Sequence, residues 1–344
     1  MLSVAQLNVR GALARDPELV FQQFHGQDII VLTETWIGEH AQLPPRPGYA
    51  AFAFPRPQRH NFRGPRGGVA VYVADHLAGR TREWRRHQGG FYAWLHIPCL
   101  HDSQPDLYLA ACYFPPMDTR HSGPTSHHAD AWTSLWDDVG EAQGLGAVLL
   151  AGDFNGRTGT GADHSTAETG DADPVDPVLL LSGASLPELL ATPRSSQDEQ
   201  INPAGRSLLS CCSTTDMRIL NGRLPGDLHG AFTCHPASGG HSVVDYFIAC
   251  PQAAQHAQHL EVQQVAVGFD HSLLVLQLRD WLCLHDVPAP LPPPVATAVA
   301  TRTGYRLTPD LIPEYQRLAV APAGAALLQD ITDAAAAAST REQA

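Results

Sequence analysis

The chain of 344 residues contains no lysine: all 22 of its basic residues are arginine, and with 35 acidic residues its formal net charge is −13. Overall charge of this sign argues against a general nucleic-acid binder, because attraction to a polyanion requires positive charge. The seven cysteines are scattered, odd in number and without any C-x-x-C spacing. Neither a disulfide framework nor a zinc-binding motif is therefore indicated.

Long apolar runs are also lacking. The longest, around Asp28–Leu32 and at Ala147–Ala151, are far shorter than the roughly 20 residues that cross a bilayer, so no transmembrane helix is predicted. The first residues contain no basic leader followed by an apolar block, which predicts a protein that is not secreted. With 44% hydrophobic residues the chain is long enough to bury a sizeable core.

The charge is unevenly distributed along the chain. Between Ala53 and Gly90 there are eight arginines against Asp75 and Glu83, a local net charge of +6, whereas residues 160–200 carry a local net charge of −7. The basic stretch fits either a solvated arginine-rich loop or a surface that follows a polyanion, and charge alone leaves both interpretations open.

Short apolar runs bounded by turn residues predict nine strands, with helical stretches between several of them. Helices are predicted at Pro17–Phe24 and at Asp130–Ala142, where four apolar residues recur at spacings of three and four. Strands and helices thus share one α/β or α+β domain with mixed sheets. The predicted strands are Leu2–Val9, Asp28–Thr33, Gly68–Val73, Phe91–Ile97, Leu107–Phe114, Ala147–Gly152, Ala231–Cys234, Val243–Ala249 and Phe269–Leu278.

Two segments differ in composition from this domain, which we place at residues 1–283. Gly156–Leu208 is acidic and rich in Gly, Pro, Asp and Ser, which predicts a loop excursion with a short helix near Ser185–Leu190. From residue 284 onwards, a proline-rich stretch at 288–294 and an alanine run at 334–338 indicate a stiff linker and a low-complexity end. We expect residues 284–344 to lie outside the core.

Polar side chains lie at the ends of nearly all the predicted strands. Singly, each has an ordinary explanation: Asn8 as a turn former, Glu34 as a helix-capping helper, Tyr113 as a half-buried strand residue. Asp245 is more informative, since a carboxylate in an apolar strand needs a partner if it is buried. In open α/β sheets ligands bind at strand ends, so the set indicates one site. Its members are Asn8, Glu34, Tyr113, Asp153, Asn155, Asp245, Asp270 and His271.

These residues, in this order, resemble the endonuclease/exonuclease/phosphatase superfamily, and they are most similar to the endonuclease domain of non-LTR (LINE-type) retrotransposons. The resemblance implies an α/β (α+β) fold, a four-layer sandwich of two packed mixed β-sheets flanked by helices. The motifs that carry the narrower likeness are Leu7–Gly11, Gly67–Tyr72, Gly152–Gly159, Asn202–Leu209, Ile219–Arg223, Phe232–Thr233 and Ser242–Ile248.

The resemblance also implies a metal cofactor. Mg²⁺, for which Mn²⁺ can substitute, would be bound by Glu34 with help from Asn8 and Asp270. Mg²⁺ takes hard oxygen ligands and is typically held by one or two carboxylates together with substrate phosphate.

The remaining site residues would perform the hydrolysis. Asp153 would orient and deprotonate the attacking water, and Asn155 would hold that water or the phosphate in line. His271, paired with Asp245, would bind the scissile phosphate and stabilise developing negative charge, and Tyr113 would donate to a phosphate oxygen.

Departures from the superfamily pattern narrow the expected substrate. Arg10 stands where many abasic-site enzymes carry Asp, and Tyr246 follows Asp245 where inositol polyphosphate phosphatases carry Arg. We therefore expect Mg²⁺-dependent phosphodiester hydrolysis by a DNA endonuclease of retrotransposon origin that nicks one strand, in the nucleus or cytoplasm. A phosphatase or phosphodiesterase acting on a small substrate such as an inositol phosphate, and a non-catalytic transposon remnant, stay open as alternatives.

DNA is the only partner that we expect; neither a membrane nor an obligate protein partner is indicated. Basic residues of the +6 stretch would contact the phosphate backbone, which positions DNA without reading its sequence. The candidates for this contact are Arg63, Arg66, Arg85 and Arg86.

Overall fold

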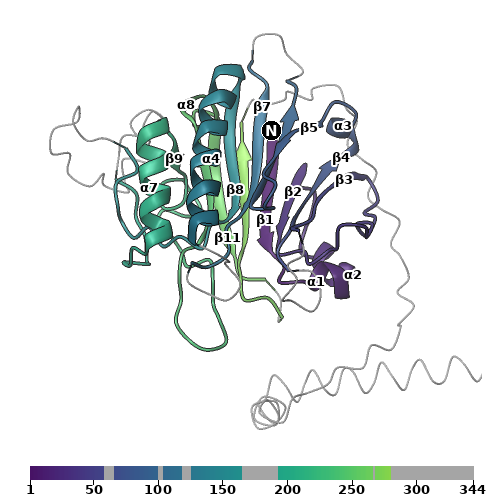
Figure 1. Cartoon of the computed structure of the whole chain (residues 1–344), viewed down its shortest axis with the longest axis horizontal. Coiled ribbons are helices and arrows are strands. Elements are labelled where there is room, and N and C mark those ends of the chain that lie inside the picture. Colours follow the sequence, from purple (N-terminus) through teal and green to yellow (C-terminus); the bar gives the residue numbers. More distant parts are fainter. Residues whose placement is uncertain (58–65, 100–103, 118–124, 165–192, 266–267, 280–344) are drawn as a thin grey trace, which may run out of the picture. The chain divides into compact units, whose positions relative to one another are not determined.

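Two six-stranded sheets packed face to face form the frame of the protein (Figure 1). The computed structural model describes residues 1–57, 66–99, 104–117, 125–164, 193–265 and 268–279, and the chain's contacts gather Met1–Asp286 into one unit. The tail expected from residue 284 and the helix expected near Ser185–Leu190 lie outside the described residues.

The first sheet has the strand order β11-β12-β1-β2-β4-β3, and the second has the order β5-β6-β7-β8-β10-β9. Both sheets are mixed: β1 with β2 and β7 with β8 are parallel pairs, and the other neighbouring strands are antiparallel. The bounds of the first sheet are Ala257–Gln263, Leu273–Leu278, Leu2–Asn8, Ile29–Thr33, Val69–Ala74 and Tyr49–Phe54 in that order. Those of the second are Arg82–Arg86, Tyr92–Ile97, Leu107–Tyr113, Ala147–Asp153, Asp245–Ala249 and Arg218–Ile219.

Helices cover the outer faces of both sheets (Figure 1). The short helices α1 and α2 pack on the first sheet, and α4 and α7 lie side by side against the second. The four-layer arrangement expected from the resemblance is therefore confirmed. The helix bounds are Ala12–Arg15 for α1, Pro17–Phe21 for α2, Asp75–Ala78 for α3, Thr125–Leu145 for α4, Pro203–Thr215 for α7 and Pro251–Ala254 for α8.

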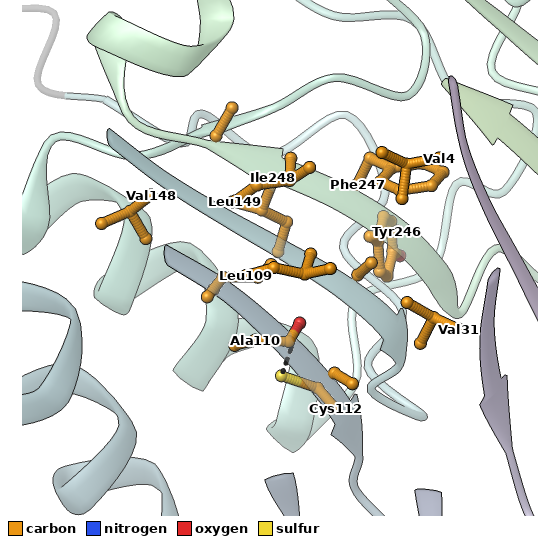
Figure 2. Close-up of a cluster of buried hydrophobic side chains, with 14 of the residues drawn as sticks. Val4, Val31, Leu109, Ala110, Cys112, Val148, Leu149, Tyr246, Phe247 and Ile248 are labelled. Atoms are coloured by element: carbon orange, nitrogen blue, oxygen red, sulfur yellow. Dashed lines mark hydrogen bonds between the residues drawn. The ribbon is translucent and has the colours of Figure 1, made fainter. Parts of the chain in front are cut away.

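The main core lies between the sheets, where apolar side chains of both meet. Figure 2 shows Val4 of the first sheet beside Phe247 of the second. Because successive strand residues point to opposite faces, Leu2 and Val4 enter this core while the alternate residues of β1 pack under α1 and α2. The long buried strands thus need apolar residues on both faces, which explains their continuous hydrophobic runs.

Some expectations about individual elements are wrong. The run Ala231–Cys234 is not a strand, since within it only Cys234 makes isolated bridges, to Ser242 and His271. Four strands were not expected, β3, β5, β9 and β11, and all four lie at sheet edges. In β5, β9 and β11 half-exposed positions carry polar residues. Polar edge strands leave no apolar run to detect.

The predicted loop excursion at 156–208 includes residues at both of its ends that belong to the folded domain. Thr158 bridges Ile201, and the side chains of Arg194 and Asp198 are buried in the unit. Helix α7 then begins at Pro203, where the Asn202 side chain accepts a hydrogen bond from the Gly205 backbone nitrogen and caps it. Among the described residues, no helix is long and apolar enough to cross a membrane.

Candidate active site

Three strands of the second sheet place polar side chains in one row. Asp153 ends β8, and the strand register sets Tyr113 of β7 and Asp245 of β10 directly beside it. Asn8 ends β1 in the first sheet, on the face that lines the inter-sheet core. The row of apolar side chains between the sheets therefore ends in a polar cluster, as the sequence predicted for these strand ends.

Asp153 is 1% exposed, and its carboxylate accepts three hydrogen bonds. Its Oδ2 accepts hydrogen bonds from the side-chain amides of Asn8 at 2.9 Å and Asn155 at 3.0 Å, and its Oδ1 accepts from the Asn155 backbone at 2.8 Å. Gly152, the residue before it, allows β8 to lie close to β7, since a Cβ there would lie 1.9 Å from the Cys112 carbonyl oxygen. The carboxylate is thus held in a single orientation.

The pKa of Asp153 is raised to about 8. Burial is the main cause, because it disfavours the charged form, and the nearby charges of Asp245 and Glu34 add to it, while His271 opposes them. A carboxylate that exchanges its proton near neutral pH is suited to act as a general base.

Asp245 and His271 form a buried pair next to Asp153. Oδ2 of Asp245 lies 2.8 Å from Nδ1 of His271, and its Oδ1 accepts from the Gln6 amide at 3.1 Å. Burial by itself would lower the pKa of His271, but the Asp245 carboxylate raises it well above its usual value. The imidazole is thus kept cationic, and its Nε2 lies 3.6 Å from the Cys234 sulfur.

Glu34 lies on the other side of Asn8, just after β2. Its Oε1 accepts from the Asn8 amide at 3.1 Å, and its Oε2 accepts from the indole nitrogen of Trp36 at 3.2 Å. Burial raises the pKa of the Tyr113 hydroxyl well above its usual value, and the charges of Glu34 and Asp153 raise it further. Tyr113 therefore stays protonated and able to donate a hydrogen bond.

Asp270 presents an oxygen that no described residue satisfies. Its Oδ2 pairs with Arg10 at 2.5 Å, whereas its Oδ1 is buried and accepts no hydrogen bond from the described part of the chain. Together with the Glu34 carboxylate, this oxygen is the type of ligand that a hard divalent cation takes. The residues present therefore fit the expected metal cofactor.

A second group could also hold a metal ion. One ligand atom each from Asp153, Asp245 and His271 lie within 4.8 Å of one another. In this group Nδ1 of His271 is already bonded to Asp245, and the imidazole is cationic, which disfavours it as a ligand. We therefore favour the oxygens of Glu34 and Asp270.

Backbone strain concentrates around this cluster. Among the described residues, five non-glycine residues have positive φ, and four of them adjoin or belong to the site: Arg10 at 42°, Glu34 at 50°, Trp36 at 53° and Asn155 at 46°. Such conformations cost free energy and are typical of functional sites, where the surrounding structure enforces them.

The hydrogen bonds of two amides orient the carboxylates of the site. The Asn8 side-chain oxygen accepts from the Arg10 backbone nitrogen, and its amide nitrogen donates to the carboxylates of Glu34 and Asp153. The side-chain nitrogen of Asn155 donates to the Phe114 carbonyl and to Asp153, so in this state it has no hydrogen left for a phosphate.

The arginines expected to contact DNA differ in their surroundings. Arg85 is paired with Asp138 and Glu141 of α4, and Arg86 is paired with Glu83. The Arg66 guanidinium instead lies 4.0 Å from the ring centre of Trp36, beside Glu34. Residue 63 lies outside the described ranges.

Four contributors to the site were missed by sequence reasoning. Gln6 and Trp36 bond the carboxylates of Asp245 and Glu34, Cys234 contacts the imidazole of His271, and the Thr233 hydroxyl accepts from the backbone nitrogen of Asp245. Two of them had a signal in the sequence. Gln6 stands two residues before Asn8 and thus on the same face of the strand, and Thr233 belongs to the motif Phe232–Thr233.

The model of the Endonuclease/Exonuclease/phosphatase family matches residues 5–266 of this chain. The chain belongs to this family. It is thus a member of a family of hydrolases that act on phosphate esters, as the resemblance implied. A search of curated protein sequences found no match.

Solved structures with the same fold include an AP endonuclease and a 3′ phosphatase. The AP endonuclease LMAP from Leishmania major is 14% identical, with a TM-score of 0.57 over 81% of this chain and 87% of its own. The 3′ phosphatase NExo from Neisseria, solved with a product DNA hairpin, is 14% identical with a TM-score of 0.52 over 82% of this chain and 100% of its own. The endonuclease domain of TRAS1, a telomere-specific non-LTR retrotransposon, is 15% identical with a TM-score of 0.48 over 81% and 98%, a likeness too loose to carry an argument.

Proposed function

We propose that the protein is a Mg²⁺-dependent DNA endonuclease of retrotransposon origin that nicks one strand of a duplex. One observation carries the proposal: a buried carboxylate with a pKa near 8, Asp153, stands beside the cationic His271–Asp245 pair, with the Glu34 carboxylate on the far side of Asn8. A base, a cation and an acid able to bind a metal ion, gathered in one cluster, are the groups that phosphodiester hydrolysis requires.

The residues of the chain divide the work of the reaction. Asp153, oriented by Asn8 and Asn155, accepts the proton of the attacking water. His271 donates from Nε2 to a phosphate oxygen, which replaces its weak contact with Cys234. Tyr113 supplies a further hydrogen bond from its protonated hydroxyl.

Glu34 and Asp270 would hold the metal ion. An ion held there would supply positive charge to offset the negative charge on the phosphate and on the leaving oxygen. Trp36 and Asn8 each donate to one oxygen of Glu34, so the orientation of this acid is fixed before any cation arrives.

Positive side chains near Glu34 support DNA as the substrate. Arg66 and Arg15 both lie over the ring of Trp36, and Arg10 is 63% exposed where it pairs with Asp270. These guanidinium groups can follow a phosphate backbone past the metal site. They are better placed for this role than Arg85, whose charge is matched by α4 carboxylates.

Relaxation of supercoiled plasmid tests the proposal. Purified protein should nick the plasmid with Mg²⁺ but not with EDTA, and Asp153→Ala and His271→Ala should both be inactive. Asp216→Ala, which removes an exposed carboxylate at the end of α7, is the matched control and should keep full activity.

Absence of nicking by folded wild-type protein would overturn the proposal. Release of inorganic phosphate from inositol phosphates would then identify a small-substrate phosphatase. DNA binding without any metal-dependent hydrolysis would identify a non-catalytic remnant.

A further inference from the structure

Gln6 is a polar residue in a place where an apolar one is expected. On the inter-sheet face of β1 it follows Leu2 and Val4, and its exposed fraction is 0%. Burying an amide costs free energy unless hydrogen bonds replace the lost water. The need for a polar side chain at position 6 is therefore not explained by core packing.

Only one end of the Gln6 amide is satisfied by the described residues. Its nitrogen donates to Oδ1 of Asp245 at 3.1 Å, while its oxygen is buried and has no hydrogen-bond partner among them. An unsatisfied buried oxygen makes the residue a cost to stability. The contact that the side chain makes in return is the hydrogen bond that its nitrogen donates to Asp245.

That donor controls how Asp245 faces the imidazole. The carboxylate has two oxygens, of which Oδ1 is bonded to Gln6 and Oδ2 to Nδ1 of His271 at 2.8 Å. The backbone nitrogen of Asp245 is in turn held by the Thr233 hydroxyl at 3.1 Å. With the backbone and Oδ1 both fixed, rotation of the carboxylate away from the imidazole is prevented.

A second amide of β1, that of Asn8, holds the carboxylate of Asp153 in a similar way. Asn8, two residues along β1, donates to Oδ2 of Asp153 at 2.9 Å. β1 of the first sheet thus provides one amide donor for each of two neighbouring carboxylates of the second sheet, Gln6 for Asp245 and Asn8 for Asp153.

We propose that Gln6 is a positioning residue, which acts through Asp245 to hold the His271 imidazole in the orientation used for phosphate binding. The inference rests on the proposed function, because His271 has this task only in phosphoester hydrolysis. Partners of this kind orient the groups that contact substrate, and their removal typically costs about 10- to 100-fold in activity.

The experiment compares Gln6→Met, which keeps the side-chain volume but loses the donor, with wild type and with Gln277→Met. Gln277 is a glutamine of β12 in the same sheet, paired with Ser3 at the opposite end of β1. In ¹⁵N-histidine-labelled protein without substrate, the Nδ1 proton of His271 should give a downfield signal, assigned by its loss in His271→Ala. This signal should shift upfield or vanish in Gln6→Met and stay unchanged in Gln277→Met.

Kinetics provide the second readout. Gln6→Met should lower kcat for nicking by about 10- to 100-fold with little change in KM, while Gln277→Met keeps both. Should Gln6→Met fail to fold, Gln6→Glu keeps the shape and replaces the donor with an acceptor, so it should lose the signal and kcat in the same way. An unchanged Nδ1 signal together with kcat within twofold of wild type, in a folded variant of either kind, would overturn the proposal.

The two readouts separate this inference from the proposed function. A signal that changes in Gln6→Met, in a protein that nicks no DNA, supports the role of Gln6 in holding His271 and refutes only the endonuclease. If wild type nicks DNA but the Gln6 variants show an unchanged signal and an unchanged kcat, the endonuclease is supported and the role of Gln6 is refuted.

Discussion

The side-chain nitrogen of Asn8 lies 2.9 Å from Oδ2 of Asp153, although 145 residues separate them and they belong to different sheets. Gln6 and Asp245 make a second bond of the same kind. The catalytic groups are therefore assembled across the inter-sheet interface, and the packing of the apolar core decides how accurately they meet.

The first prediction concerns the dependence of activity on pH. Asp153 acts as a base only when deprotonated, and burial, followed by the charge of Asp245, raises its pKa to about 8, so kcat/KM of wild type should rise with pH towards that value. Asn8→Asp adds a third carboxylate beside it, which should move the midpoint to higher pH.

A rate–pH profile measures both effects. Gln264→Asp adds the same charge at an exposed position just after β11 and should leave the midpoint in place. An unchanged midpoint in Asn8→Asp would mean that Asp153 is not the group that titrates.

The second prediction is that Asp245 and His271 act as one unit. Asp245→Asn and His271→Gln should each lower kcat by about 10²- to 10⁴-fold, because either change removes the positioned cation. The double variant should be no slower than the slower single variant. Multiplicative losses in steady-state kinetics would show instead that the two side chains work independently.

The third prediction concerns stability, away from the catalytic groups. Asp163 and Arg223 form an ion pair with fully buried side chains, and their atoms lie 2.6 Å apart. Asp163→Asn removes the negative charge that faces the buried guanidinium and should lower the free energy of unfolding by about 3–5 kcal/mol. Asp216→Asn, which removes an exposed partner of Arg218, should cost less than about 1 kcal/mol.

The difference in free energy of unfolding between wild type and Asp163→Asn should also depend on pH. Burial alone would raise the pKa of Asp163, but hydrogen bonds and charge from Arg223 lower it below its usual value. The pair thus stabilises the fold above the unfolded-state pKa of about 3.9 and loses that contribution as the pH falls through the lower folded value. Urea unfolding should show a constant difference between wild type and variant from about pH 5 to 8 and a smaller one below about pH 4.

The fourth prediction separates the arginines by their surroundings. Arg66→Ala should reduce the salt dependence of DNA binding by about one phosphate contact, a change of about 0.9 in slope. Arg85→Ala should change it little, because that side chain is already paired with Asp138 and Glu141. DNA-binding titrations at several salt concentrations measure this slope for each variant. A larger change in slope for Arg85→Ala than for Arg66→Ala would indicate that β5, and not the surface near Trp36, contacts DNA.

Much of the fold could be predicted because it depends on local patterns. The long buried strands carry continuous apolar runs, and residues of β1, β2, β8 and β10 appeared at nearly their observed bounds. Edge strands such as β5 were missed, since their half-exposed residues are polar and their pairing is decided by a neighbouring strand rather than by their own sequence.

By itself the sequence determined where most strands lie along the chain and which polar residues stand at their ends. The two-residue period of a strand also fixes which of its side chains share a face. Only the tertiary structure decided which of those side chains touch. Gln6 meets Asp245 across 239 residues, and Arg85 is neutralised by acids of α4. Contacts between elements so far apart in the chain depend on how two sheets and a helix pack, and no local pattern encodes that geometry.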